Sequence, residues 1–171
     1  MNVIKAPDPR LRVKTKPVKK ITAGLLQTLK QMIKLAKTFK EPEGVGLAST
    51  QIGMEESFFV AKNGQKFISV INPQILSSGK RTKKYFEGCL STPHIWGEVK
   101  RHTRIKISYQ DQTGKVVTTS VKGVLAWIFQ HEIDHLDGIL FQDRVLEQKS
   151  KFYKYTGKDK TGQDCFEEVT L

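Results

Sequence analysis

The feature that most constrains this chain is a pair of histidines four residues apart, His131 and His135, with Glu132 directly after the first. Residues i and i+4 of an α-helix lie on the same face, so a helix here brings both imidazoles to one metal ion. Glu132 then lies next to a water molecule on that ion. This arrangement is typical of metal-dependent hydrolases, in which the carboxylate carries the proton.

The same segment is strongly apolar. A largely buried helix is predicted over Gly123–Leu136, with Gly138 as its C-terminal stop. The hydrophobic residues that predict it are Leu125, Ile128, Phe129, Ile133 and Leu136. Buried histidines and a buried glutamate need polar partners, and one metal ion satisfies all three. On an exposed helix, by contrast, the two histidines would only cap or pair.

A second helix is predicted near the N-terminus. Apolar residues recur at helical spacing from Leu25 to Phe39, with lysines on the other face and Thr22 as the N-cap. Three prolines keep residues 3–20 irregular or extended, and the segment 41–44 ends the helix.

The middle of the chain is typical of β-structure. Segments 57–61 and 67–71 predict a hairpin around Asn63-Gly64, with Asn72-Pro73 closing its second strand. Alternation of apolar and polar residues predicts further strands at 104–109 and 116–121, and a final short strand is predicted at 166–171.

This order predicts an α+β fold: mixed or antiparallel β-sheets packed around a central helix that carries the His-Glu-x-x-His motif, with an N-terminal helix and a short C-terminal strand. Residues 1–171 are expected to form a single catalytic domain. Two cysteines are too few for a disulfide framework. No apolar run approaches a membrane span and no secretory signal is visible, so a cytoplasmic location is expected.

The net charge of +12 is unevenly distributed: residues 1–40 carry eleven Lys or Arg and one acid, Asp8. The charge is either a solvated face or a sign that the chain works near a polyanion such as RNA. No RNA-reading motif is present. The sequence therefore predicts weak, salt-sensitive attraction and no sequence-specific nucleic-acid binding.

A catalytic metal ion needs a third protein ligand beside two histidines. The downstream candidates are all acids: Asp137, Asp143 and Glu147. Upstream lies Cys89, whose thiolate suits Zn²⁺ or Fe²⁺, although a single cysteine is more often a core residue. Residue chemistry alone leaves both possibilities open.

Three motifs, in order and in register, resemble the peptide deformylase family. They are Gly44-Val45-Gly46-Leu47-Ala48-Ser49-Thr50-Gln51, Glu87-Gly88-Cys89-Leu90-Ser91 and Gln130-His131-Glu132-Ile133-Asp134-His135-Leu136-Asp137-Gly138. The resemblance runs from about Val3 to Arg144. It implies a hydrolase that removes the N-terminal formyl group from formyl-methionyl nascent peptides and releases formate.

The resemblance also implies a role for individual residues. The metal ligands are Cys89, His131 and His135. The native metal is Fe²⁺, which Zn²⁺, Ni²⁺ or Co²⁺ can replace. Metal-bound hydroxide attacks the formyl carbonyl while Glu132 acts as general base and then as general acid. The side chain of Gln51 and the backbone N–H of Leu90 stabilise the oxyanion.

The substrate site follows from the same resemblance. Gly46 lets an extended peptide approach the backbone and bind by strand addition. Methionine needs an unbranched apolar pocket, whose candidate residues are Val45, Tyr85, Val124, Trp127 and Ile128. Trp127 is bulkier than the usual residue of the family and alternatively faces the core.

Two segments depart from the family pattern. Residues 93–97 lack the arginine that many members place near the peptide backbone. The tail from Lys151 lacks the long basic helix with which one form of the family docks on the ribosome. Weak ribosome association is therefore expected through the basic N-terminal half.

Two other functions compete with this reading. A zincin-type protease also uses the His-Glu-x-x-His motif but takes its third ligand downstream. A non-catalytic, metal-stabilised protein associated with RNA would need no base or oxyanion donor, so Glu132, Gln51 and Cys89 together argue against it.

Overall fold

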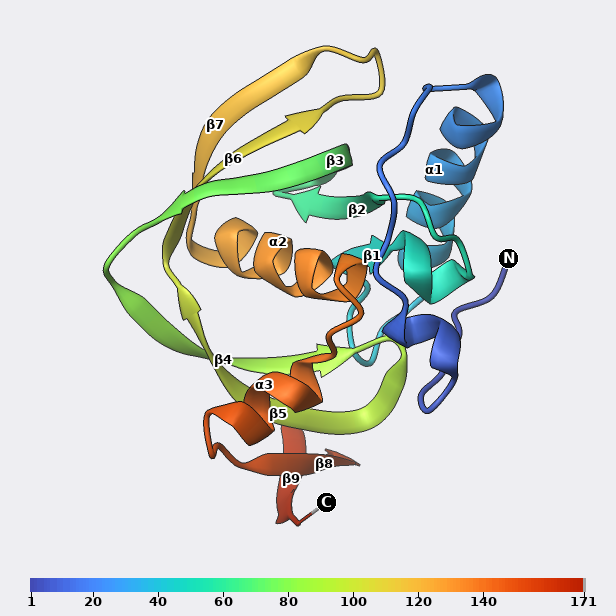
Figure 1. Cartoon of the computed structure of the whole chain (residues 1–171). Helices are drawn as coiled ribbons and strands as arrows, with labels where there is room; N and C mark the ends of the chain where they lie inside the picture. The colour runs from blue at the N-terminus through green and yellow to red at the C-terminus, as the bar shows by residue number, and fades with distance from the viewer. Residues whose placement is uncertain (171) are drawn as a thin grey trace.

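Helix α2 (Gly123–Leu136) lies at the centre of the molecule, between two β-sheets (Figure 1). A computed structural model describes residues 1–170 of the chain. Most of the helix is buried, as expected for a helix with apolar residues around its circumference. Gly138 follows it with φ of 74°, and a Cβ there would lie 2.4 Å from the carbonyl oxygen of Arg12. The predicted glycine stop is thus confirmed.

On one side of α2 is a five-stranded antiparallel sheet with the order β1-β2-β3-β6-β7. Its strands are β1 (Gly46–Ala48), β2 (Phe58–Asn63), β3 (Lys66–Ser78), β6 (Arg104–Gln110) and β7 (Val116–Lys122). The pairing of β2 with β3 confirms the hairpin around Asn63-Gly64.

The prediction that Asn72-Pro73 closes this hairpin is wrong. Strand β3 continues to Ser78 through a register shift after Ile71, where a proline costs no ladder hydrogen bond. At the shift Asn72 has φ of 51°, and its side chain exchanges two hydrogen bonds with the backbone of Val18 at 2.7 and 2.9 Å. The irregularity therefore attaches the N-terminal segment to the sheet.

On the other side of α2 is a four-stranded antiparallel sheet with the order β4-β5-β8-β9. Its strands are β4 (Thr82–Cys89), β5 (Thr92–His102), β8 (Phe152–Lys158) and β9 (Asp164–Val169). Sequence reasoning predicted one C-terminal strand and missed its partner β8. Of the predicted segment 166–171, Leu171 lies outside the described residues. Figure 1 shows the β8–β9 hairpin extending the sheet beside β5.

The remaining helices are α1 (Ala23–Ala36), α3 (Phe141–Glu147) and the short 3-10 turns η1 (Pro9–Arg12) and η2 (Ser49–Ile52). Thr22 caps α1, since its hydroxyl accepts from the N–H of Leu25 at 3.2 Å. The α+β prediction is confirmed, and both sheets are antiparallel. Within residues 1–170, no helix combines the length and apolar character needed to cross a bilayer.

Two edge strands border the same space. β1 is at one edge of the five-stranded sheet and β4 is at one edge of the four-stranded sheet. Gly46 of β1 and Gly88 of β4 both line one cavity, with α2 along its wall. The fold therefore leaves two open strand edges and a helix face around one hollow.

Candidate active site

Cys89 of β4, far from α2 in the sequence, meets His131 and His135 beside this hollow. The ligand atoms of Cys89, His131 and His135 all lie within 4.8 Å of one another, and Cys89 Sγ is 3.2 Å from His135 Nε2. Ligands at 2.0–2.3 Å from a tetrahedral metal ion lie about 3.3–3.8 Å apart, so the spacing fits one ion. Within the described part of the chain, no other group of His, Cys, Asp or Glu is close enough to hold one.

The downstream acids are directed elsewhere. Asp137 pairs with Lys14, Asp143 with Arg12, and Glu147 with Arg144. The alternative that sequence chemistry left open, a third ligand among these acids, has no support in the geometry. Cys89 is that third residue, and it is buried.

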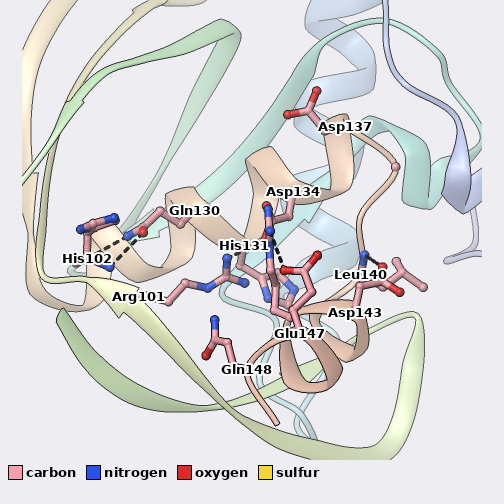
Figure 2. A network of polar contacts seen from close by, with 12 residues as sticks. Arg101, His102, Gln130, His131, Asp134, Asp137, Leu140, Asp143, Glu147 and Gln148 are labelled. Atoms are coloured by element: carbon pink, nitrogen blue, oxygen red, sulfur yellow. Dashed lines mark hydrogen bonds and ion pairs between the residues drawn. The ribbon is translucent and has the colours of Figure 1, made fainter. Parts of the chain in front are cut away.

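The ring of His131 is oriented by a hydrogen bond to Glu87 on the side away from the metal site. Its Nδ1 lies 2.9 Å from Glu87 Oε2, and a carboxylate only accepts, so Nδ1 holds the hydrogen and Nε2 is left for a metal. Glu87 is fully buried and also accepts from Arg101 at 2.8 and 3.0 Å. Figure 2 shows Arg101 reaching from β5 toward His131 and Asp134 on α2.

A second set of hydrogen bonds joins helix α2 to β5. The side-chain amide of Gln130 donates to the carbonyl of His102 at 2.9 Å and accepts from its N–H at 3.1 Å (Figure 2). Asp134, directly before His135, is held by Arg101 and by Arg144 of α3. These buried contacts fix the position of the helix that carries the histidines.

Glu132 reaches the hollow from the same helix. It is 3% exposed, and its Oε2 has no hydrogen-bond partner among residues 1–170. Its carboxylate lies against Gly46, where a Cβ would come within 2.2 Å of Oε1. A glycine is required there because any side chain would occupy the place of the carboxylate.

Gln51 is placed by two hydrogen bonds. Its Oε1 accepts from the N–H of Ala48 at 2.8 Å, and its Nε2 donates to Ser91 Oγ at 3.1 Å. The same Nε2 is 3.5 Å from Cys89 Sγ, so one N–H is anchored and the other is directed at the metal ligands. Strand β4 ends at Cys89, and Leu90 follows on the cavity wall.

The electrostatics of the site follow from burial and close contacts. Burial raises the pKa of Glu132 to about 7. Burial also opposes ionisation of Cys89, but the neighbouring His135 and His131 outweigh it and hold the pKa of the thiol well below its usual range. Hydrogen bonds from His131 and Arg101 overcome the burial of Glu87 and lower its pKa to about 2. The chain thus supplies an anionic sulfur to a divalent cation.

A cavity of about 320 Å³ adjoins these groups. Val124, Trp127 and Ile128 line it from the helix face that, one turn further, presents His131. Val45 and Gly46 line it from the β1 side. An apolar pocket therefore lies about one helical turn, roughly 5.4 Å, from the metal ligands.

Of the five residues predicted for the methionine pocket, the structure brings four to this cavity. The fifth, Tyr85, lies behind Trp127, with the rings stacked at 5.4 Å and an interplanar angle of 6°. Trp127 lines the cavity and does not belong solely to the core. Sequence reasoning missed Pro42, Glu43 and Trp96 at the other end of the cavity, and no periodic signal marked them.

Sequence reasoning also gave no role to Glu87, Ser91 or Arg101. Glu87 and Ser91 are the first and last residues of the Cys89 motif, so their place in the motif was the available signal. Arg101 is 6% exposed. In sequence it stands among exposed basic residues, and nothing there marks it as buried.

Comparison with known proteins agrees with this geometry. The family described as polypeptide deformylase matches residues 1–151. A peptide deformylase of Thermotoga maritima is 43% identical over 142 residues, which are 83% of this chain and 85% of that protein. One of Syntrophomonas wolfei is 40% identical over 147 residues, 86% of this chain and 94% of that protein.

Solved structures agree as well. The crystal structure of the Thermotoga maritima peptide deformylase has a TM-score of 0.80 and 41% identity, covering 84% of this chain and 95% of that chain. A peptide deformylase of Synechococcus elongatus, solved in complex with actinonin, has a TM-score of 0.80 and 33% identity. The match covers 84% of this chain and 78% of that chain.

Proposed function

This chain belongs to the peptide deformylase family, and from that premise we propose that it hydrolyses the formyl amide of N-formylmethionyl nascent peptides and releases formate. The observation that supports this best is the convergence of Cys89, His131 and His135 with the buried Glu132 carboxylate beside an apolar cavity. The family and the metal-ligand cluster together make the chain a metal-dependent hydrolase.

The ligand set fits a divalent cation. Cys89, His131 and His135 would hold it, and Glu87 would fix the ring of His131. When bound, the cation supplies Lewis acidity, which polarises the formyl carbonyl and lets water ionise near neutral pH. A thiolate with two imidazoles suits Fe²⁺ as well as Zn²⁺, Ni²⁺ or Co²⁺, and we propose Fe²⁺ as the native ion.

The residues of the chain then act in sequence. Glu132 takes the proton of the attacking water and later delivers it to the amine, which would otherwise leave as a poor amide anion. The oriented N–H of Gln51 and the backbone N–H of Leu90 donate to the oxygen that gains charge. Burial of Glu132 keeps bulk water from competing for its proton.

The peptide is held by the two strand edges. An extended chain between β1 and β4 gains backbone hydrogen bonds by strand addition, because both strands are at open sheet edges and both line the cavity. The methionine side chain enters the pocket formed by Val124, Trp127 and Ile128. Trp127, fixed against Tyr85, closes the pocket with a rigid wall.

The direct test is formate release from formyl-Met-Ala-Ser by protein loaded anaerobically with Fe²⁺ or with Ni²⁺. We expect stoichiometric formate and a free N-terminal methionine, and no cleavage of the internal peptide bonds. Internal cleavage would support the protease alternative. Stable metal binding without formate release would support a non-catalytic role.

We propose further that residues 1–171 work as one catalytic domain in the cytoplasm. Supporting the first point, α2 contacts strands of both sheets, so neither sheet is an independent unit. Supporting the second, formylated nascent chains are cytoplasmic substrates in the family that the chain resembles.

Weak ribosome association is a separate proposal. Lys19, Lys20 and Lys34 are exposed and form no ion pair within residues 1–170, so their charge is available to phosphates. Reversing these three charges should weaken co-sedimentation with ribosomes at low salt. The same reversal of three exposed lysines near the C-terminus, Lys149, Lys154 and Lys160, is the control. Equal loss in both variants would contradict a role for the N-terminal half.

A further inference from the structure

The C-terminal hairpin β8–β9 contacts the active-site cavity through one residue, Trp96. The hairpin lies beyond residues 1–151, which the family matches. Strand β8 pairs with β5 so that Tyr153 lies opposite Trp96. Phe166 of β9 packs edge-on against the indole, with ring centroids 5.4 Å apart at 72°. The hairpin thus supports one side of Trp96.

Strand β4 supports Trp96 as well. Phe86 stacks on the indole at 5.3 Å and 14°. The ring lies over Gly88, where a Cβ would come within 2.8 Å of Trp96 Cε2. Gly88 directly precedes Cys89, so the indole is held in one orientation beside the metal ligands, and it lines the cavity.

A loop completes this end of the cavity. Pro42 lines it together with Trp96, and Glu41 is partly buried next to them. The pKa of Glu41 is raised, first by burial and then by Asp164 of β9, which places the loop close to the hairpin. Glu41 Oε1 and Trp96 Nε1 are both buried, and the indole N–H opposes the rise in the pKa of the Glu41 carboxyl group. This end therefore combines an apolar wall with a buried carboxyl group beside the indole.

The direction of an extended peptide links this end to a particular substrate residue. Successive side chains of a strand point to opposite sides. Along β4, Tyr85 and Glu87 face α2, whereas Phe86 and Gly88 face the side on which Trp96 lies. A methionine side chain directed toward α2 leaves the next side chain directed away from α2, toward Trp96.

We propose that Trp96, supported by the C-terminal hairpin, forms a subsite for the side chain of the second residue of the formylated peptide and favours aromatic or large apolar side chains there. The proposal rests on the proposed deformylase function. A side chain stacked on the indole gains contact that glycine cannot make, which corresponds to about a tenfold preference.

The test compares kcat/KM for formyl-Met-Phe-Ser and formyl-Met-Gly-Ser, using metal-loaded protein. We expect the wild type to prefer the phenylalanine peptide about tenfold. Trp96→Ala should reduce that ratio to about one, and Phe166→Ala should reduce it part of the way. Trp96→Phe should retain most of the preference. Thr156→Ala, an exposed change on the same hairpin, should leave the ratio unchanged.

A second measurement uses the unaltered protein and does not depend on the folding of a variant. The chain has two tryptophans, so its Zn²⁺-loaded form has two side-chain indole N–H signals in a ¹⁵N–¹H spectrum, which Trp127→Phe assigns. The product Met-Phe-Ser should shift the Trp96 signal more than Met-Gly-Ser does.

The outcomes distinguish a failure of the proposed function from a failure of the proposed subsite. A wild type that deformylates neither peptide overturns the proposed function, and the subsite with it. A wild type that deformylates both peptides with a ratio that Trp96→Ala does not change overturns the subsite alone. Equal shifts of the Trp96 signal by both products would overturn it as well.

Discussion

Replacing Gly46 by alanine tests the placement of the catalytic carboxylate most sharply. The added Cβ would lie 2.2 Å from Glu132 Oε1, 2.7 Å from Cδ and 3.0 Å from Cγ, where ordinary contact begins at 3.4 Å. Glu132 is 3% exposed, and the open space beside its side chain is the cavity that it lines. The carboxylate must therefore retreat by about 1 Å, a displacement that costs about 10²-fold in rate when it misplaces a reacting group.

The expected result is a loss of about 10²-fold in kcat for formate release, with metal binding retained, because the three atoms nearest to the added Cβ all belong to Glu132, which is not a metal ligand. Turnover is measured with formyl-Met-Ala-Ser, and the metal site by the absorption spectrum of the Co²⁺ form. Gly24→Ala on α1 is the matched control, since its Cβ would meet only Thr22 Oγ1 at 3.6 Å. Near-normal turnover of Gly46→Ala would refute the role of the Glu132 carboxylate in this position.

Three further changes follow from the same geometry. Glu132→Ala should keep its metal and lose most turnover, and wild-type turnover would remove Glu132 from the mechanism. Cys89→Ala should lose its metal on dialysis that the wild type withstands; a variant that retains it would indicate a downstream ligand. Arg101→Met removes the cation shared by two buried carboxylates, leaving Glu87 with His131 and Asp134 with Arg144, and should lower the free energy of unfolding by about 3 kcal/mol in urea titrations. Lys84→Met breaks a solvent-exposed pair and should cost less than about 1 kcal/mol, so equal effects would contradict the buried-charge argument.

Local patterns predicted the elements that depend on neighbours in sequence. Thr22 begins α1 and Gly138 stops α2 as expected, because capping and left-handed backbone are decided within a few residues. The hairpin around Asn63-Gly64 is of the same kind. By contrast, α3 was not predicted, because its seven residues are too few to show a helical period. Strand β8 was not predicted either, although its partner β9 was.

Other predictions depended on long-range contacts and could not be made locally. Asn72-Pro73 has the composition of a strand end, yet β3 continues because Asn72 bonds to Val18 at the register shift. Arg101 belongs to a run of basic residues that sequence treats as surface. Its burial results from two carboxylates, Glu87 and Asp134, that the fold brings from β4 and α2.

The sequence by itself determined the chemistry of this protein. Two histidines at helical spacing with a glutamate between them, and the cysteine motif upstream, specified a metal hydrolase, because residue type and local spacing fix what a side chain can bind or protonate. Only the tertiary structure decided which groups share the site. It selected Cys89 over three downstream acids, set Gly46 against Glu132, moved Tyr85 behind Trp127 and brought Trp96 to the cavity with the C-terminal hairpin behind it. These relations join residues far apart in the chain, and sheet order and packing fix them where local sequence cannot.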